Sequence, residues 1–455
     1  VFGFGHRLGP SLTPRRLPQP PAFAQMSLTV CKEGVTAPQK RRSQRNACWG
    51  FASVAGAFAF LCGVALQSLP SPTDATGQPL LGVDALLVYY TGLFLHCMNL
   101  GHTSRAPAPR ISDDLLAAAP AKWELSPLPE LRAGIDFNNQ HELLRAFAPF
   151  NERKQPVVIK NFLDHDHASN WAGAFQKLAH PWWDTEYLRQ ELAGVEVRVF
   201  DNYSTDESLA WWDFKDYADE VIQNKSSIAY ARAITEHWEA RPDMFDAIDF
   251  DLVDDMAARM PYWRRLLHEW HFASMPAAVF VSGKIPTTRL HCDMGESFVF
   301  HTEGQKRWRF FPPSMSPLMR PFTMVKTTGF IAGFDVWKPD FQAEPHLRFL
   351  RGWEVVTDPG DMIYFPSQTW HGVENLGERN VIFDIPRLDI PRGFQNNWPH
   401  GLATVLHPGG AINWFRYCVL GAKSIDGHRL PQKHSCAKEV FFQTYGYKQR
   451  TQKEL

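Results

Sequence analysis

The segment that decides the fold reads TRLHCDMGESFVFHTEGQKRWRFFPP and covers residues 288–313. Short apolar or alternating runs, separated by glycine and proline turns, fill this part of the chain and are typical of an antiparallel β-sandwich or barrel. Successive side chains of a strand point to opposite faces, so His291 and Asp293 are expected to share one face. A lone H-x-D pair is weak evidence for a metal site, so the rest of the chain has to supply the support.

The remainder of the segment predicts a hairpin. The strand is expected to continue through Val299, to turn at Glu303–Gly304, where glycine supplies a positive φ, and to return as residues 305–311. In this register His301 faces Lys306, which places Lys306 on the metal-binding side.

The charged side chains of the returning strand divide between its two faces. Lys306 would be buried, and a buried lysine is costly unless it meets an anion, whereas Arg307 and Arg309 would face solvent. His301 could line the same pocket, but a hydrogen-bonded core histidine explains it at least as well. Cys292 alternates away from its two neighbours and is expected to be a buried apolar residue.

A second segment, DPGDMIYFPSQTWHGVEN (residues 358–375), supplies a third candidate ligand. A turn at Pro359–Gly360 leads into the apolar strand 362–365, Pro366 ends that strand, and a short loop delivers His371 to the start of the next one. A histidine beside a tryptophan is more often a packed residue than a ligand. The spacing of His371 after the turn favours the ligand.

These patterns resemble a known family. The cupin-like spacing is carried by Gly360, Pro366, His371 and Asn375, with Gln368 where a glycine is usual. The order T-x-x-H-x-D, then G-x-K, then F-F-P-P resembles the JmjC hydroxylases, above all the asparaginyl hydroxylase of hypoxia-inducible factor. The resemblance covers about residues 123–389, because residues 156–162 and Trp171 also resemble the opening of cupin-like JmjC domains.

The resemblance implies a mainly β fold with flanking helices: a double-stranded β-helix of the jelly-roll, cupin or JmjC type. It implies Fe(II) held by His291, Asp293 and His371, because two imidazoles and a carboxylate leave three coordination positions open. Two of these would take 2-oxoglutarate and one O₂. By the family pattern, Lys306 pairs with the distal carboxylate of 2-oxoglutarate and Thr288 hydrogen-bonds to it.

The activity implied is that of a 2-oxoglutarate-dependent dioxygenase that hydroxylates a protein side chain and releases succinate and CO₂. Ser297 stands where the asparaginyl hydroxylase has an asparagine, and Asp384 lies near where many relatives place an amide, so the secondary contacts to cosubstrate or substrate differ. Alternatives within the family are a JmjC-type lysine demethylase and an RNA-modifying hydroxylase. An alternative of another class is a non-catalytic, membrane-anchored cupin-fold binding protein.

The amino-acid composition of the chain helps to choose between these alternatives. The 47 basic and 48 acidic side chains nearly cancel, which gives no support to nucleic-acid binding through a general positive field. The seven cysteines form no C-x-x-C pair, so neither a zinc cluster nor a redox motif is indicated.

The chain is predicted to have five parts. They are a disordered leader (1–46), a signal peptide or transmembrane anchor (47–66), a second apolar segment with a linker (67–120), the catalytic domain (121–390) and a C-terminal extension (391–455). Residues 47–66 contain no charged side chain, follow four basic residues and are just long enough to span a bilayer as an N-terminal hydrophobic helix. The apolar stretch 85–98 is shorter and suits a core or interfacial helix.

The leader predicts a location as well. A basic flank before an apolar stretch indicates membrane anchoring or entry into the lumen of the secretory pathway. The final residues, Gln452 to Leu455, loosely resemble an endoplasmic-reticulum retrieval signal. An organelle-targeting leader is the alternative.

Overall fold

The protein is described here from a computed structural model. It describes residues 69–98 without 75, then 109, 111–163, 183–201, 208–223, 229–233, 250–257, 278–284, 287–293, 295–323, 329–388, 390–405, 424–425 and 428–429. All of them belong to one compact unit, residues 68–455. The predicted leader and the apolar segment 47–66 lie outside the described residues, so the N-terminal hydrophobic helix and the location remain predictions.

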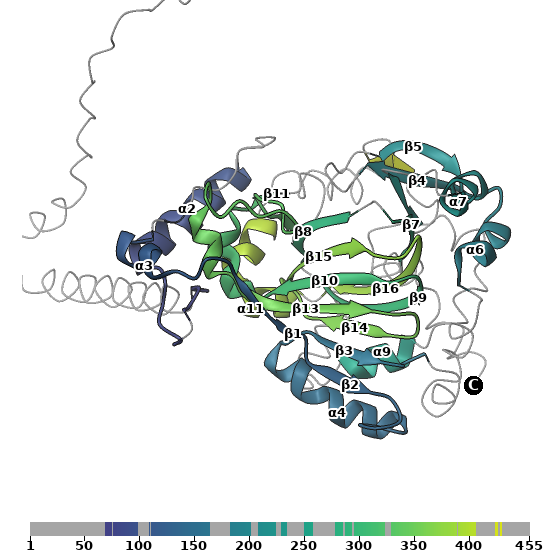
Figure 1. Cartoon of the computed structure of the whole chain (residues 1–455), viewed down its shortest axis with the longest axis horizontal. Helices are drawn as coiled ribbons and strands as arrows, with labels where there is room; N and C mark the ends of the chain where they lie inside the picture. Colours follow the sequence, from purple (N-terminus) through teal and green to yellow (C-terminus); the bar gives the residue numbers. More distant parts are fainter. Residues whose placement is uncertain are drawn as a thin grey trace, which may run out of the picture. The chain divides into compact units, whose positions relative to one another are not determined.

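The unit is mainly β, with two large sheets and a few helices (Figure 1). One sheet, here the minor sheet, has seven strands in the order β1 (Glu124–Pro127), β13 (Arg351–Thr357), β10 (Lys306–Phe311), β15 (Trp370–Asn375), β8 (Thr287–Asp293), β12 (Gly329–Ile331) and β11 (Phe322–Thr323). The major sheet has nine, in the order β2 (Glu130–Arg132), β3 (Val157–Lys160), β14 (Met362–Phe365), β9 (Gly295–Glu303), β16 (Arg379–Leu388), β7 (Ala278–Gly283), β6 (Ala229–Ala233), β4 (Glu196–Asp201) and β5 (Ser208–Asp213). This architecture is consistent with the predicted jelly-roll fold.

Helices surround the two sheets. Their bounds are α2 (Val83–Met98), α3 (Asp113–Ala118), α4 (Gln140–Arg153), α6 (Thr185–Glu191), α7 (Phe214–Ile222), α9 (Phe250–Ala257) and α11 (Ile390–Val405), with the 3₁₀ helices η3 (Pro313–Met319) and η4 (Pro345–Phe349). A small hairpin, β17 (Ser424–Ile425) and β18 (His428–Arg429), follows. Figure 1 shows α2, α3 and α11 grouped at one end, and α6 and α7 near β4 and β5 at the other.

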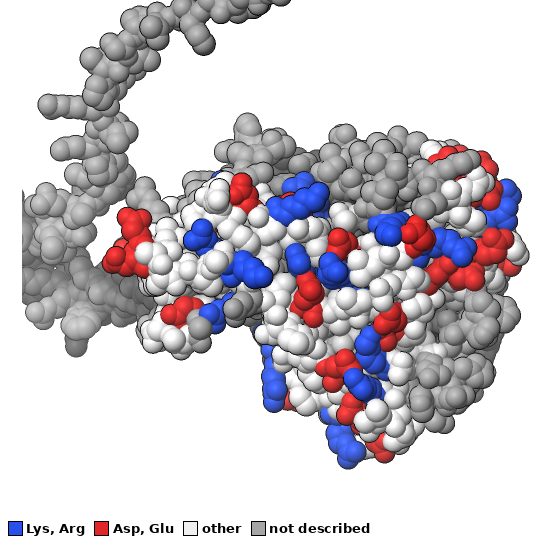
Figure 2. Space-filling model, in the orientation of Figure 1, with Lys and Arg blue, Asp and Glu red and all other residues white. Residues whose placement is uncertain are grey.

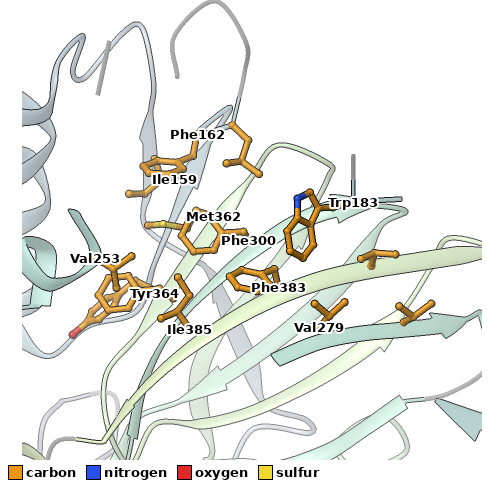
Figure 3. Close-up of a cluster of buried hydrophobic side chains, with 14 of the residues drawn as sticks. Ile159, Phe162, Trp183, Val253, Val279, Phe300, Met362, Tyr364, Phe383 and Ile385 are labelled. Carbon is orange, nitrogen blue, oxygen red and sulfur yellow. The ribbon is translucent and has the colours of Figure 1, made fainter. Parts of the chain in front are cut away.

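The run Met362 to Phe365 is apolar throughout because β14 is buried on both faces. Met362 and Tyr364 belong to a large apolar cluster on the outer face of the major sheet, which also includes Phe300 and Phe383 (Figure 3). Ile363 and Phe365 point the other way, into a second cluster between the two sheets. Because its side chains alternate, β14 contributes to two apolar clusters, one on each face of the major sheet.

The second cluster shows that the inner faces of the two sheets meet. Val299, Phe365 and Ile382 come from the major sheet, whereas Trp308 and Val373 come from the minor sheet. The interior between the sheets is therefore a largely apolar space, in which a charged group is poorly solvated.

The predicted hairpin at Glu303–Gly304 is wrong in its pairing. β9 lies in the major sheet between β14 and β16, whereas β10 lies in the minor sheet between β13 and β15. The turn is present, with Gly304 at a φ of 83°, but it carries the chain from one sheet to the other. Nor do residues 288–301 form one strand, because β8 and β9 also belong to different sheets. Lys306 nevertheless points inward as predicted, because the two sheets face each other and bring His301 and Lys306 to the same interior.

Helix α2 lies within the region 67–120 that was expected to be an apolar segment and a linker. Its inner face is buried, and the hydroxyl of Tyr89 donates to the carbonyl oxygen of Ser316 in η3 at 3.0 Å. Among the described residues, none of the helices combines the length and the apolar character that crossing a membrane requires.

Candidate metal centre

The three predicted ligands come together on the inner face of the minor sheet. His291 on β8 lies directly opposite His371 on β15, and their ring centroids are 4.1 Å apart. Asp293 ends β8, and its Oδ2 lies 3.6 Å from Nε2 of His291. One ligand atom from each residue lies within 4.8 Å of the other two, and no other such group of three occurs in the described part of the chain.

Backbone contacts fix the tautomer of both histidines. Nδ1 of His291 lies 2.8 Å from the carbonyl oxygen of Arg289, and Nδ1 of His371 lies 3.0 Å from that of Thr369. A carbonyl oxygen only accepts, so each Nδ1 carries the hydrogen and donates it. In a neutral ring with this tautomer, Nε2 presents its lone pair, as a metal ligand requires.

Burial keeps the His371 imidazole uncharged, so that its nitrogen is available to bind a metal ion. The pKa of His371 is lowered well below its usual value, chiefly by burial and then by His291, so its ring is neutral at physiological pH. His291 and His371 are almost fully buried, whereas the side chain of Asp293 is 40% exposed and marks the open side. Two imidazoles and one carboxylate fit a divalent first-row metal and leave coordination positions open.

The loop before His371 is held from several sides. Gln368 adopts a left-handed conformation with φ 64°, and its backbone N–H donates to the carbonyl oxygen of Asp293 at 2.7 Å. This φ explains why glycine is usual at this position of the motif. The indole N–H of Trp370 donates to Oγ of Ser316 at 2.8 Å, which anchors the residue next to the ligand.

Thr288 reaches the inner face through a bulge. Strand alternation alone would place it opposite to His291, because the two residues are three positions apart. Val373 pairs with Thr288 while His371 pairs with His291, so β8 contains one extra residue between them. The bulge returns Thr288 to the ligand side.

Lys306 is buried further along the same inner face. Only 4% of its surface is exposed, and its Nζ donates to the carboxamide oxygen of Asn375 at 2.5 Å. Burial lowers the pKa of Lys306 to about 7. Arg307 and Arg309 point outward as predicted and pair with Glu374 and Glu354.

His301 is a hydrogen-bonded core residue. Its Nε2 lies 2.9 Å from the carbonyl oxygen of Glu303, so Nε2 donates, and its Nδ1 accepts from the hydroxyl of Thr357 at 2.9 Å. Burial and the charge of Lys306 lower the pKa of His301 to about 3. Cys292 is fully buried, as expected.

The two departures from the family pattern line the interior. Ser297 pairs with Phe365 and Asp384 pairs with Val299, so both side chains share the face of the second apolar cluster. Sequence reasoning missed Phe365, an aromatic neighbour of the candidate ligands, whose ring centroid lies 4.3 Å from that of His371. The apolar run 362–365 held that signal, but its register did not follow from the sequence.

Several known proteins are similar to parts of this chain. The 2-oxoglutarate and iron-dependent oxygenase JMJD4 of Mus musculus is 25% identical over 213 residues, which are 43% of this chain and 47% of that protein. HSPB1-associated protein 1 of Bos taurus is 32% identical over 91 residues, 20% of this chain and 19% of the relative. Arginine-specific demethylase JMJ20 of Arabidopsis thaliana is 30% identical over 101 residues, 22% and 21% of the two chains.

The matched regions are partial: the chain spans about a fifth of the length of HSPB1-associated protein 1 and just under half of JMJD4. The family described as the cupin-like domain matches residues 144–385, which is more than half of the 455 residues. The chain therefore belongs to the cupin-like JmjC domain family.

Proposed function

We propose that this chain is an Fe(II)- and 2-oxoglutarate-dependent dioxygenase in which His291, Asp293 and His371 hold the iron. The observation that carries the proposal is the convergence of two imidazoles and one carboxylate on the wall of an apolar interior. This donor set with open positions is that of the non-haem Fe(II) oxygenases. The similarity to JMJD4, whose name specifies both iron and 2-oxoglutarate, supports the assignment.

Lys306 and Thr288 are the proposed contacts for the distal carboxylate of 2-oxoglutarate. Lys306 is buried, and among the described residues no carboxylate forms an ion pair with it. A buried cation is stabilised strongly by an anion that shares its low-dielectric surroundings. Thr288 shares the inner face, and its hydroxyl can donate to the same carboxylate.

The protein's own part in the reaction is to orient reactants and exclude water. Bound Fe(II) with 2-oxoglutarate and O₂ would supply the oxidising chemistry that releases succinate and CO₂ and hydroxylates the substrate. The carbonyl groups of Arg289 and Thr369 hold the two imidazoles in one orientation. Phe310 and Phe365 cover the site with apolar surface, which keeps bulk water from the reacting groups.

A protein side chain is the proposed substrate. The names of two relatives point to proteins, since one is described as associated with HSPB1 and one as an arginine-specific demethylase. Among the described residues on the face in Figure 2, basic and acidic side chains lie side by side, which gives no support to binding of an RNA backbone. Substrate would enter past Asp293, the exposed member of the three ligands.

Demethylation is a second candidate, favoured by the similarity to JMJ20. Hydroxylation of an N-methyl carbon uses the same site, and the product then releases formaldehyde. The two chemistries are distinguished by product, because side-chain hydroxylation retains the added oxygen on the peptide.

The test is turnover by the full chain with Fe(II), 2-oxoglutarate and a panel of unmodified and methylated peptides. Succinate release, together with either an oxygen added to the peptide or released formaldehyde, is expected from the wild type and not from His291→Ala. His346→Gln is the matched control, since His346 is buried in η4 outside the three ligands. Turnover that survives in His291→Ala, or that is absent from a wild type loaded with iron, would overturn the proposal and favour a non-catalytic binding protein.

A further inference from the structure

Lys306 sits at a junction between the two sheets. On β10 it pairs with Asn375 of β15, and its Nζ donates to the carboxamide oxygen of Asn375 at 2.5 Å. Across the interior, Asn375 contacts β7 of the major sheet. The lysine is therefore held through a residue that is itself fixed between the sheets.

The orientation of the Asn375 carboxamide follows from its partners. Its NH₂ group donates to Oγ of Ser282 at 3.0 Å and to the carbonyl oxygen of Gly283 at 2.9 Å. A flipped carboxamide would turn its oxygen toward the Gly283 carbonyl and its NH₂ group toward the ammonium of Lys306, which are both repulsive contacts. The oxygen therefore has to face Lys306.

An amide in this position orders the lysine without neutralising it. The carboxamide oxygen accepts one ammonium proton but carries no formal charge, so the site keeps a net positive charge for an anionic ligand. An aspartate of the same shape would pair with Lys306 and cancel that charge. The chemical difference between amide and carboxylate at this one position thus decides whether a carboxylate ligand is attracted.

We propose that Asn375 is a positioning residue that holds Lys306 ready for the distal carboxylate of a 2-oxo dicarboxylic acid, and so sets the preference for such acids over monocarboxylic ones. The inference rests on the proposed function, because it takes the cosubstrate to bind between the metal ligands and Lys306. Ser282 contributes by fixing the carboxamide.

The experiment compares two cosubstrate probes in full-length protein loaded with Zn(II), which does not turn over. 2-Oxoglutarate has the distal carboxylate, whereas 2-oxobutyrate has only the 2-oxo acid group that reaches the metal. Titration calorimetry gives the ratio of their affinities. Asn375→Asp is expected to lower the affinity for 2-oxoglutarate by about 10- to 100-fold, the size of a lost charge-assisted hydrogen bond, with the affinity for 2-oxobutyrate little changed.

Two further variants separate positioning from simple damage. Asn380→Asp is the matched control, because Asn380 is buried like Asn375 and also donates to the Gly283 carbonyl, at 3.3 Å, but does not bond to Lys306. It should leave the ratio of affinities as in the wild type. Ser282→Ala should weaken 2-oxoglutarate binding by a few fold, because the carboxamide loses one of its anchoring hydrogen bonds. Zinc content and far-UV circular dichroism confirm that each variant is folded and loaded.

The outcomes distinguish this inference from the proposed function. If the zinc-loaded wild type binds neither probe, the proposed function fails. Suppose instead that the wild type binds 2-oxoglutarate more tightly than 2-oxobutyrate, and that Asn375→Asp, folded and zinc-loaded, shows the same ratio of affinities. The role of Asn375 is then overturned while the proposed function stands. An equal loss of affinity for both probes in Asn375→Asp would also overturn the role of Asn375, because that pattern indicates general damage to the site.

Discussion

Replacing Lys306 with methionine is expected to raise the free energy of unfolding in the absence of cosubstrate and to abolish binding of 2-oxoglutarate. Burial lowers the pKa of Lys306 from 10.5 to about 7, which corresponds to a cost of about 5 kcal/mol for carrying the charge in the folded protein. The variant avoids this cost but leaves the carboxamide oxygen of Asn375 without its donor, which costs about 1–3 kcal/mol. The free energy of unfolding at pH 7 should therefore rise by about 2–4 kcal/mol.

The effect depends on pH with a definite sign. The unfolded chain keeps the proton on Lys306 up to its usual pKa of 10.5, whereas the folded protein releases it above about pH 7. The wild type therefore gains stability as the pH rises through this window and loses it as the pH falls back toward 7. Urea denaturation of both proteins at pH 7 and at pH 10 should show the advantage of Lys306→Met at pH 7 and its disappearance or reversal at pH 10.

Lys160→Met is the matched control, because Lys160 pairs with the buried carboxylate of Asp361 at 2.5 Å. Removing this lysine leaves an unpaired buried carboxylate, so the variant should be less stable than the wild type at both pH values. The reasoning about Lys306 is refuted if Lys306→Met is less stable than the wild type at pH 7, or if the difference between them does not change with pH.

Three further substitutions test other parts of the account. Thr288→Val should weaken 2-oxoglutarate binding by about tenfold, for one lost hydrogen bond, and leave metal content unchanged in calorimetry and metal analysis. Gln368 has a φ of 64°, so thermal denaturation should show Gln368→Gly close to the wild type and Gln368→Val less stable by about 1–2 kcal/mol; equal stability of the two variants would contradict the strain argument. Glu296 is buried and accepts from Arg392 at 2.9 Å, so urea denaturation of Glu296→Leu should show a loss of about 3–5 kcal/mol, and a neutral result would show that the pair adds nothing.

The sequence predicted that His291, Asp293 and His371 would lie together, because their signals are local. Two of them alternate on one strand, and the turn at Gly360 and the stop at Pro366 fix where His371 enters the next strand. Strand parity also predicted the inward side of Lys306 and the outward sides of Arg307 and Arg309. These inferences need only the period of a strand and the chemistry of its turns.

The pairing partners of the strands could not be predicted in the same way. A glycine turn between two strands normally indicates a hairpin, but in this fold the turn at Gly304 carries the chain between two sheets, and the partners β14 and β16 come from much later in the sequence. The bulge that turns Thr288 inward is likewise visible only in the pairing of β8 with β15. The carboxamide of Asn375 is held by Ser282, which is 93 residues away along the chain.

The most direct test of the account is anaerobic titration of 2-oxoglutarate into the full chain, with and without Fe(II). The account predicts one bound 2-oxoglutarate per chain when iron is present, much weaker binding without it, and loss of bound iron in His371→Ala. Iron-independent binding, or wild-type binding of both iron and 2-oxoglutarate by His371→Ala, would contradict the assignment of His291, Asp293 and His371 as the metal centre.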